Sequence, residues 1–167
     1  MAQGLNSKNF PGRIAKKYGT EMNGKKIKVS CISCGQTNYY PEKAENKKVV
    51  CGRCHRPLPR PGEVLKVSPD QATSLISRSS LPVLADFFSD NCGPCLMMAP
   101  ILERLARRRA GEIVVIKIDV DRYPDVAAQL AIQAVPTFIV FHKDAERGRA
   151  SGAMPETDFA LWVAKLT

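Results

Sequence analysis

Three C-x-x-C pairs constrain this chain of 167 residues more than any other feature of its sequence. The pairs are Cys31/Cys34, Cys51/Cys54 and Cys92/Cys95, and they account for all six cysteines. A spacing of two residues lets both sulfurs of a pair bind one metal ion or form a short disulfide. In a reducing compartment such pairs are more often metal ligands or catalytic thiols than structural disulfides. The residues around each pair therefore decide which chemistry it predicts.

Composition excludes a chain built to span a membrane. Hydrophobic residues make up 44% of the sequence and charged residues 25%, which is typical of a globular protein. No stretch approaches the roughly 20 apolar residues of a membrane span, and the N-terminus has no apolar segment of secretory-signal length. We therefore expect a cytoplasmic monomer that does not contact membranes.

The cysteine pairs fall into two segments that a proline-rich linker separates. Residues 1–28 lack apolar periodicity and are expected to form a flexible basic arm. Residues 29–56 hold the first two pairs, and residues 57–62 contain three prolines, which favour a stiff, extended linker. Residues 63–167 alternate strand-like and helix-like segments, so we expect an α/β domain with a mixed central sheet and helices on both faces.

Hydrophobic periodicity predicts the elements of this α/β domain. Ser68 followed by Pro69 is typical of a helix start, because serine caps the first turn and proline suits its first position. The expected strands are 63–67, 82–88, 113–120, 137–142 and, with less support, 149–153; the expected helices are 69–79, 94–108, 123–130 and 156–166.

The two N-terminal pairs predict a metal site. Cys31, Cys34, Cys51 and Cys54 follow the pattern C-x₂-C-x₁₆-C-x₂-C, and four thiolates suit one structural Zn²⁺ per chain. The segment has few apolar residues, whereas structural zinc contributes on the order of 10–16 kcal/mol to folding. Two disulfides, or iron in place of zinc, remain alternatives. His55 is surplus to the four-cysteine set.

The positive charge is concentrated in the first third of the chain. Residues 1–62 carry a balance of +10 and residues 63–167 a balance of −1, for a net charge of +9. Zn²⁺ with four thiolates would lower the N-terminal balance to about +8. A basic region of this kind is either a solvated extension or a contact for nucleic acid or an acidic protein surface. Within the cysteine segment 29–56 only Tyr39 and Tyr40 provide aromatic side chains, which limits base stacking.

The third pair has the position of a redox-active dithiol. Cys92 and Cys95 lie between a predicted buried strand and the helix predicted from residue 94. Unpaired N–H groups and the positive end of a helix favour a thiolate at the first cysteine. Cys92 is therefore the expected attacking thiol and Cys95 the resolving thiol. An inert or metal-binding pair is the alternative.

The sequence Cys92-Gly93-Pro94-Cys95 resembles the active site of the thioredoxin family, and the resemblance covers about residues 63–167. The four-cysteine segment in front of this domain makes the chain similar to the zinc-containing bacterial thioredoxins, in which a small zinc ribbon precedes the thioredoxin fold. Further positions match the family: Asp86, Pro100, Lys117, Val135, Pro136, Thr137 and Gly152.

This resemblance implies roles for two charged residues. Asp86 resembles the buried carboxylate that exchanges a proton with Cys95, and burial would raise its pKa toward neutrality. Lys117 resembles the neighbouring cation that moderates this shift.

The resemblance also implies a substrate-binding surface. Pro136 would form a cis peptide bond, and Val135 would offer its backbone to an extended substrate. Gly93, Pro94 and Gly152 would complete that surface.

Three positions depart from the family pattern. Asn91 and Phe88 stand where the family usually has tryptophan, and Asp144 stands where it often has a turn glycine. These departures bear on substrate range and redox potential more than on the type of reaction.

The implied activity is the reduction of protein disulfides through a mixed disulfide on Cys92 that Cys95 resolves. An NADPH-dependent thioredoxin reductase would restore the dithiol, and no bound nicotinamide is expected because the chain has no glycine-rich dinucleotide loop. The alternative is a nucleic-acid or protein binding module with a redox-sensing, thioredoxin-like domain.

Overall fold

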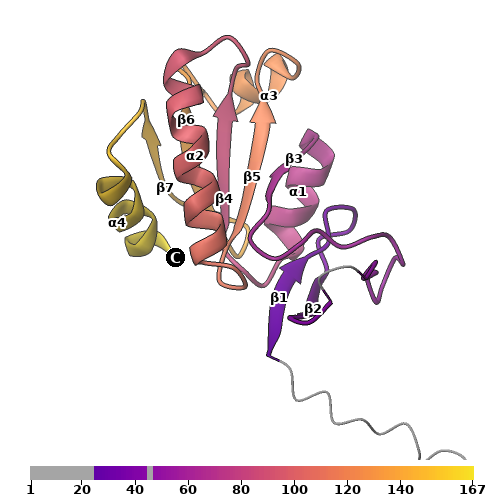
Figure 1. Cartoon of the computed structure of the whole chain (residues 1–167). Coiled ribbons are helices and arrows are strands. Elements are labelled where there is room, and N and C mark those ends of the chain that lie inside the picture. Colours follow the sequence, from indigo (N-terminus) through magenta and orange to yellow (C-terminus); the bar gives the residue numbers. More distant parts are fainter. Residues whose placement is uncertain (1–24, 45–46) are drawn as a thin grey trace, which may run out of the picture.

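The computed structural model describes residues 25–44 and 47–167 (Figure 1). Most of the basic arm predicted for residues 1–28 lies outside this part of the chain. The described residues form a small two-stranded hairpin and a five-stranded sheet with helices on both faces. None of the helices in these residues has the length and apolar character needed to cross a bilayer.

The large sheet has the strand order β3-β5-β4-β6-β7. The strands β3, β5 and β4 run parallel to one another, while β6 and β7 are antiparallel to their neighbours, so the expected mixed sheet is confirmed. The strands are β3 (Val64–Lys66), β4 (Val83–Phe88), β5 (Val114–Asp119), β6 (Thr137–His142) and β7 (Ala145–Ser151).

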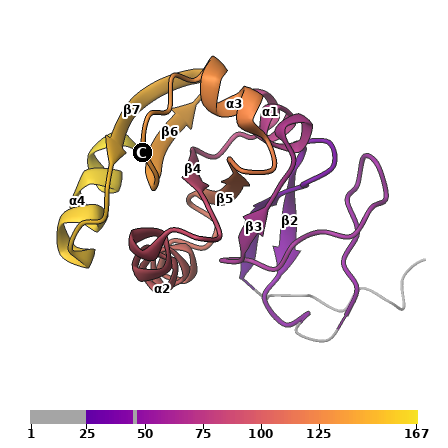
Figure 2. The ribbon, with the colours of Figure 1, turned by 90° about the horizontal axis from the view of Figure 1, so that it is seen from above.

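Four helices cover this sheet, two on each face (Figure 2). Side chains of α2 and α4 pack with the sheet residues Leu84, Val115 and Phe138, and side chains of α1 and α3 pack with residues of the opposite face. This division follows from the alternation of side chains along each strand. The helices are α1 (Pro69–Arg78), α2 (Gly93–Arg108), α3 (Pro124–Gln129) and α4 (Glu156–Leu166).

Local sequence signals explain where several elements begin. Ser68 caps α1: its hydroxyl accepts a hydrogen bond from the backbone N–H of Gln71, and the Gln71 side chain accepts one from the Ser68 backbone. The last strand differs from the prediction of 149–153, because it begins at Ala145. Lys143 and Asp144 both have positive φ and form a tight turn that pairs β7 with β6 directly.

The N-terminal module is an antiparallel hairpin of β1 (Lys26–Ser30) and β2 (Thr37–Pro41). Its β1 begins at Lys26, three residues before the expected start of the cysteine segment at residue 29, because pairing with β2 continues to Pro41. The core of the module is small and consists of the buried side chains of Val29, Tyr40 and Ala44, with Val49 and Leu58 packed against them.

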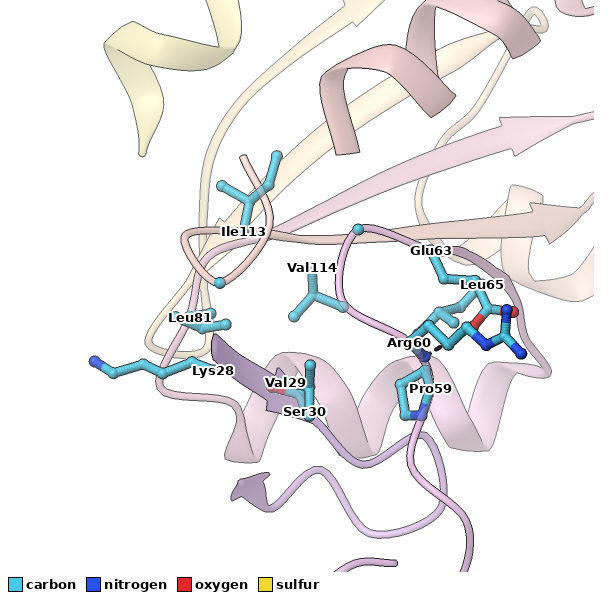
Figure 3. Close-up of a pocket in the computed structure, with 12 residues that line it drawn as sticks. Lys28, Val29, Ser30, Pro59, Arg60, Glu63, Leu65, Leu81, Ile113 and Val114 are labelled. Carbon is cyan, nitrogen blue, oxygen red and sulfur yellow. Dashed lines mark hydrogen bonds between the residues drawn. The ribbon is translucent and has the colours of Figure 1, made fainter. Parts of the chain in front are cut away.

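The hairpin packs closely against the larger domain. The Ser30 hydroxyl lies 2.7 Å from that of Ser79 in a buried contact, and the Ser80 backbone N–H donates to the Thr37 hydroxyl at 3.1 Å. Ile32, which lies between two of the cysteines, packs against the core cluster beneath α1. Figure 3 shows the remaining space between the two parts, a hollow of about 20 Å³ that is large enough for roughly one water molecule.

Gly35 brings the first cysteine loop against α1. Its φ of +70° lies in the left-handed region, and a Cβ added there would collide with the Ser74 carbonyl oxygen and lie 2.7 Å from the Arg78 Cβ. No other residue type meets both requirements, because only glycine combines this backbone conformation with the absence of a side chain.

We predict that Gly35→Ala lowers the free energy of unfolding by about 2 kcal/mol or more, because the added methyl group must displace helix backbone. Urea denaturation followed by circular dichroism measures the loss. Gly52→Ala is the matched control in the second cysteine loop, since its new Cβ would meet nothing closer than Asn38 Oδ1 at 3.7 Å. Equal losses in the two variants would contradict this account of the packing.

Candidate active site and metal centre

Cys92 and Cys95 lie in the first turn of α2 and form a disulfide, with their Cα atoms 5.2 Å apart. Cys92 is the N-cap of the helix, and its sulfur accepts a hydrogen bond from the Cys95 backbone N–H at 3.1 Å. The Cys92 side chain is half-buried, whereas Cys95 is only 4% exposed. The two sulfurs therefore differ in their access to a large reaction partner.

The loop before β6 lies beside the disulfide. The Val135–Pro136 peptide bond is cis, as expected, and the Val135 carbonyl oxygen lies 3.6 Å from the Cys92 sulfur. Gly152 donates its backbone N–H to the Pro136 carbonyl oxygen at 2.8 Å and has a φ of +89°. The structure thus brings together three of the residues predicted to bind substrate.

Gly93 and Pro94, the other two residues predicted to bind substrate, occupy the exposed first turn of α2 between the cysteines. A Cβ added to Gly93 would meet no atom within 4 Å. The backbone beside the Cys92 sulfur is therefore open to approach.

Asp86 is a buried carboxyl group on the same sheet face as Leu84, which is the face that α2 covers. Burial raises the pKa of Asp86 to about 7, against the opposing effect of Lys117. Lys117 lies opposite Asp86 on the neighbouring strand β5. Its Nζ is 3.9 Å from Asp86 Oδ2. Asp86 Oδ1 accepts no hydrogen bond from the described residues.

The aromatic ring of Phe88 lies close to the amino groups of two lysines. The Nζ of Lys117 lies 4.1 Å from the centre of its ring and that of Lys66 lies 4.9 Å away. Both separations are within the range of cation–π attraction. The ring therefore helps to position the cation that faces Asp86.

Sequence reasoning missed Lys66. Its Nζ also lies 3.4 Å from Asp119 and 3.6 Å from Asp90, so it links the end of β5 to the residues that follow β4. In the structure Lys66 lies in register with Lys117 on the neighbouring parallel strand, and such residues share a face of the sheet. That register follows only once β3 is placed beside β5.

The four N-terminal cysteines form the second cluster of the molecule. Their sulfurs all lie within 4.8 Å of one another, with Cys31 3.6 Å from Cys54 and Cys34 3.7 Å from Cys51. A tetrahedral ion with metal–sulfur bonds of about 2.3 Å places its sulfurs about 3.8 Å apart, so the donor set fits such an ion. These four cysteines could therefore bind a metal ion.

The two cysteine loops have matching backbones. Gly35 N–H donates to the Cys31 carbonyl at 2.8 Å, and His55 N–H donates to the Cys51 carbonyl at 3.0 Å. The φ of Gly35 is +70° and that of His55 is +57°. His55 thus occupies the turn position that glycine fills in the first loop, and it does not belong to the metal-binding group.

Burial and hydrogen bonds shift the pKa values of the thiols in this cluster in opposite directions. Burial raises the pKa of Cys31 to about 12. Desolvation also acts on Cys51, but N–H groups of the Cys54 and Arg53 backbone and of the Asn38 side chain lower its pKa to about 6. The cluster therefore already stabilises one thiolate, and a bound cation would favour the deprotonated form of all four.

The family model for thioredoxin matches residues 63–165, which is more than half of the chain. The chain belongs to the thioredoxin family. As a thioredoxin-family protein it is a thiol–disulfide oxidoreductase, with disulfide-containing substrates and a reductase as partners. The mixed sheet flanked by helices is the thioredoxin fold.

Relatives and solved structures agree with this assignment. The chain is 34% identical over 135 residues to Thioredoxin C-3 of Corynebacterium nephridii, an alignment that covers 81% of this chain and 92% of that protein. It is 42% identical over 91 residues to Thioredoxin 1 of Chlorobaculum tepidum, covering 54% and 90% of the two chains. The alignment with Thioredoxin C-3 is longer than the 103 residues of 63–165, so it also takes in residues outside that range.

Among solved structures, a crystal structure of chloroplastic thioredoxin z matches with 36% identity and a TM-score of 0.58, covering 62% of this chain and 94% of that one. A mutant thioredoxin from Halobacterium salinarum matches with 31% identity and a TM-score of 0.59, covering 65% and 95%.

We predict that stability depends on the ionisation of Asp86. Its pKa is raised from 3.8 to about 7 on folding, so the folded state binds the proton more tightly. The free energy of unfolding should therefore fall as pH rises from about 4 to about 7 and then level off, by up to about 4 kcal/mol.

Asp86→Asn removes this dependence, because an amide does not ionise. Denaturation of the disulfide form of both proteins between pH 4 and pH 9 isolates the effect, since Cys92 and Cys95 do not titrate in that form. The variant should gain stability relative to the parent chain as pH rises. A difference that stays constant across this range would contradict the burial of an ionisable carboxyl group.

Proposed function

We propose that this thioredoxin-family protein reduces protein disulfides through Cys92 and Cys95. The observation that carries the proposal is the asymmetry of the pair, with a half-buried sulfur at the helix N-cap bonded to a buried one. Cys92 as a thiolate attacks one sulfur of the substrate disulfide and releases the other as a thiolate. Cys95 then attacks Cys92, which releases the reduced substrate and leaves the Cys92–Cys95 disulfide. Two electrons pass to the substrate.

The start of α2 supports Cys92 as both attacking and leaving group. The Cys95 N–H that points at the Cys92 sulfur stabilises negative charge there, and the positive helix end adds to the effect. The larger gain comes from Cys95, which is held in position for the second attack without any loss of translational freedom.

Asp86 is proposed as the proton carrier for Cys95. It lies on the sheet face beneath α2, and a pKa of about 7 lets it accept and return a proton near neutral pH. Lys117 keeps this pKa from rising further, and Phe88 positions Lys117. Both act on the reaction through Asp86.

The substrate is proposed to lie along the loop before β6. Val135 and Pro136 would face its backbone near the attacked cysteine, with Gly152 behind them and Gly93 and Pro94 leaving the approach open. An NADPH-dependent thioredoxin reductase is the proposed source of electrons, so the nicotinamide would bind to that enzyme.

We propose that Cys31, Cys34, Cys51 and Cys54 hold one Zn²⁺, as in a small zinc ribbon. When bound, the ion would crosslink the two cysteine loops and stabilise the module, whose own core contains only a few apolar side chains. The closed set of four thiolates leaves no open position on the ion, so its role would be structural. In this proposal, residues 29–56 bind the metal ion and residues 63–167 carry out the redox chemistry.

Cys95→Ser should trap the mixed disulfide. With insulin as substrate, the variant should accumulate a covalent adduct on Cys92 and lose turnover by a factor of about 10³ or more, because nothing resolves the intermediate. Non-reducing electrophoresis and mass spectrometry detect the adduct. Cys92→Ser is the matched variant and should form none. If Cys92→Ser instead formed an adduct on Cys95 as fast as Cys95→Ser forms one on Cys92, the assigned roles would be contradicted.

Metal analysis tests the zinc site. The purified chain should contain one zinc per molecule, and Cys34→Ser should lose the ion and lower the melting temperature, because three thiolates bind zinc far less tightly than four. His55→Asn is the control, since asparagine tolerates the left-handed backbone at this position and His55 lies outside the metal-binding group. Iron in the purified protein, or disulfides within the four-cysteine cluster, would contradict the proposal.

A further inference from the structure

An apolar groove lies between α2 and the segment that follows β7. It has a volume of about 380 Å³, and it is lined by Met97, Met98, Ile101, Ala153, Met154 and Pro155. None of these six residues is charged or carries a hydrogen-bonding side chain other than a thioether. Met97 is 68% exposed, which is unusual for a large apolar side chain.

Every methionine among the described residues lines the groove. Met97, Met98 and Met154 line it, and the remaining two of the five, Met1 and Met22, lie outside that part of the chain. Methionine has a flexible, polarizable side chain that adapts to partners of different shape. A surface of this composition suits the recognition of varied apolar side chains.

The groove begins within a few residues of the disulfide site along both segments that line it. Ala153 directly follows Gly152, whose backbone is hydrogen-bonded to Pro136, and Met97 lies on the helix that Cys92 caps. At a rise of 1.5 Å per residue, Met97 and Ile101 lie roughly 7 Å and 13 Å along the helix axis from Cys92. An extended chain advances about 3.3 Å per residue, so it would cover these distances in two to four residues.

The charged side chains nearest to the groove along the chain lie outside its lining and contact one another. Arg104 forms two-pronged contacts with Glu156, which begins α4, and Arg108 also reaches that carboxylate. None of these three charged residues lines the groove, and the Glu156 carboxylate is shared between two arginines. The chemistry of the groove therefore favours an apolar occupant.

We propose that the groove binds an apolar side chain of the substrate polypeptide, located two to four residues from the cysteine that Cys92 attacks. The inference rests on the proposed reductase function and adds a selectivity to it. A volume of about 380 Å³ accommodates one or two side chains of the size of leucine, methionine or phenylalanine. Substrates with an apolar residue at this distance are then reduced in preference to those without one.

Paired peptide disulfides test the selectivity on the full-length protein. Each peptide carries one disulfide-bonded cysteine, with leucine or serine placed at positions two to four on either side of it. At the preferred position the parent chain should show a kcat/KM about 5- to 20-fold higher for the leucine peptide, because burial of that side chain lowers the barrier. The readout is the ratio between the two peptides.

Two substitutions should reduce this ratio toward one. Met97→Gln keeps the length of an exposed side chain while adding polarity, and Ala153→Glu places a charge in the groove. Met97→Leu should retain the preference. Leu161→Gln is the matched control, because Leu161 is 57% exposed on α4 and does not line the groove, and it should leave the ratio unchanged.

The possible outcomes separate the two proposals. If the parent chain reduces neither peptide, the proposed reductase function fails. If it reduces both peptides equally, or if Met97→Gln and Ala153→Glu leave the ratio intact, the groove proposal is overturned while the reductase function stands. A loss of the ratio in Leu161→Gln as well would attribute the effect to general surface polarity and would also overturn it.

Discussion

The turn between β4 and α2 is the constraint on which the active site depends. It ends a fully buried strand and begins a helix at once, so Cys92 becomes the N-cap and Cys95 lies within the first turn. This geometry brings the sulfurs within bonding distance and aims a backbone N–H at the outer one. The reactivity proposed for the pair would thus be a property of the helix end, which exposes unpaired donors that a helix interior would satisfy internally.

Asp86 is a buried carboxyl group that destabilises the fold when it is ionised. A charged group on the inner face of a sheet destabilises the folded state unless its proton is retained, and the raised pKa of Asp86 records that conflict. Lys117 offsets this destabilisation only in part, since its Nζ lies 3.9 Å from the carboxylate and also interacts with the Phe88 ring. Such partial pairing suits the proton carrier proposed above, because a fully paired carboxylate would remain ionised at neutral pH.

The cysteine module is attached to the redox domain by close packing. Gly35 packs against α1, and Ile32 packs against the core of the domain. The buried hydroxyl groups of Ser30 and Ser79 form a hydrogen bond with each other. A module with so small a core of its own gains support from this interface, and a metal ion held by its four cysteines, as proposed, would add to it. The two clusters of cysteines nevertheless lie in separate parts of the fold, with the hairpin against α1 and the disulfide at the start of α2.

The sequence by itself determined the features that depend on neighbouring residues. Ser68 and Pro69 predict the start of α1, the spacing of Cys92 and Cys95 predicts a dithiol at a helix start, and the strand and helix 137–142 and 156–166 have the predicted bounds. The start of β7 was predicted wrongly, because Lys143 and Asp144 adopt positive φ without the glycine that usually announces such a turn.

Only the tertiary structure decided which distant residues meet. Lys66 and Lys117 share the Phe88 ring through strand pairing, Gly35 is required by a helix about 40 residues later, and the methionine groove joins α2 to the segment after β7. The physical reason is that periodicity assigns a residue to a face of its own element. Which element covers that face is set by the register of the sheet and by the packing of the helices upon it.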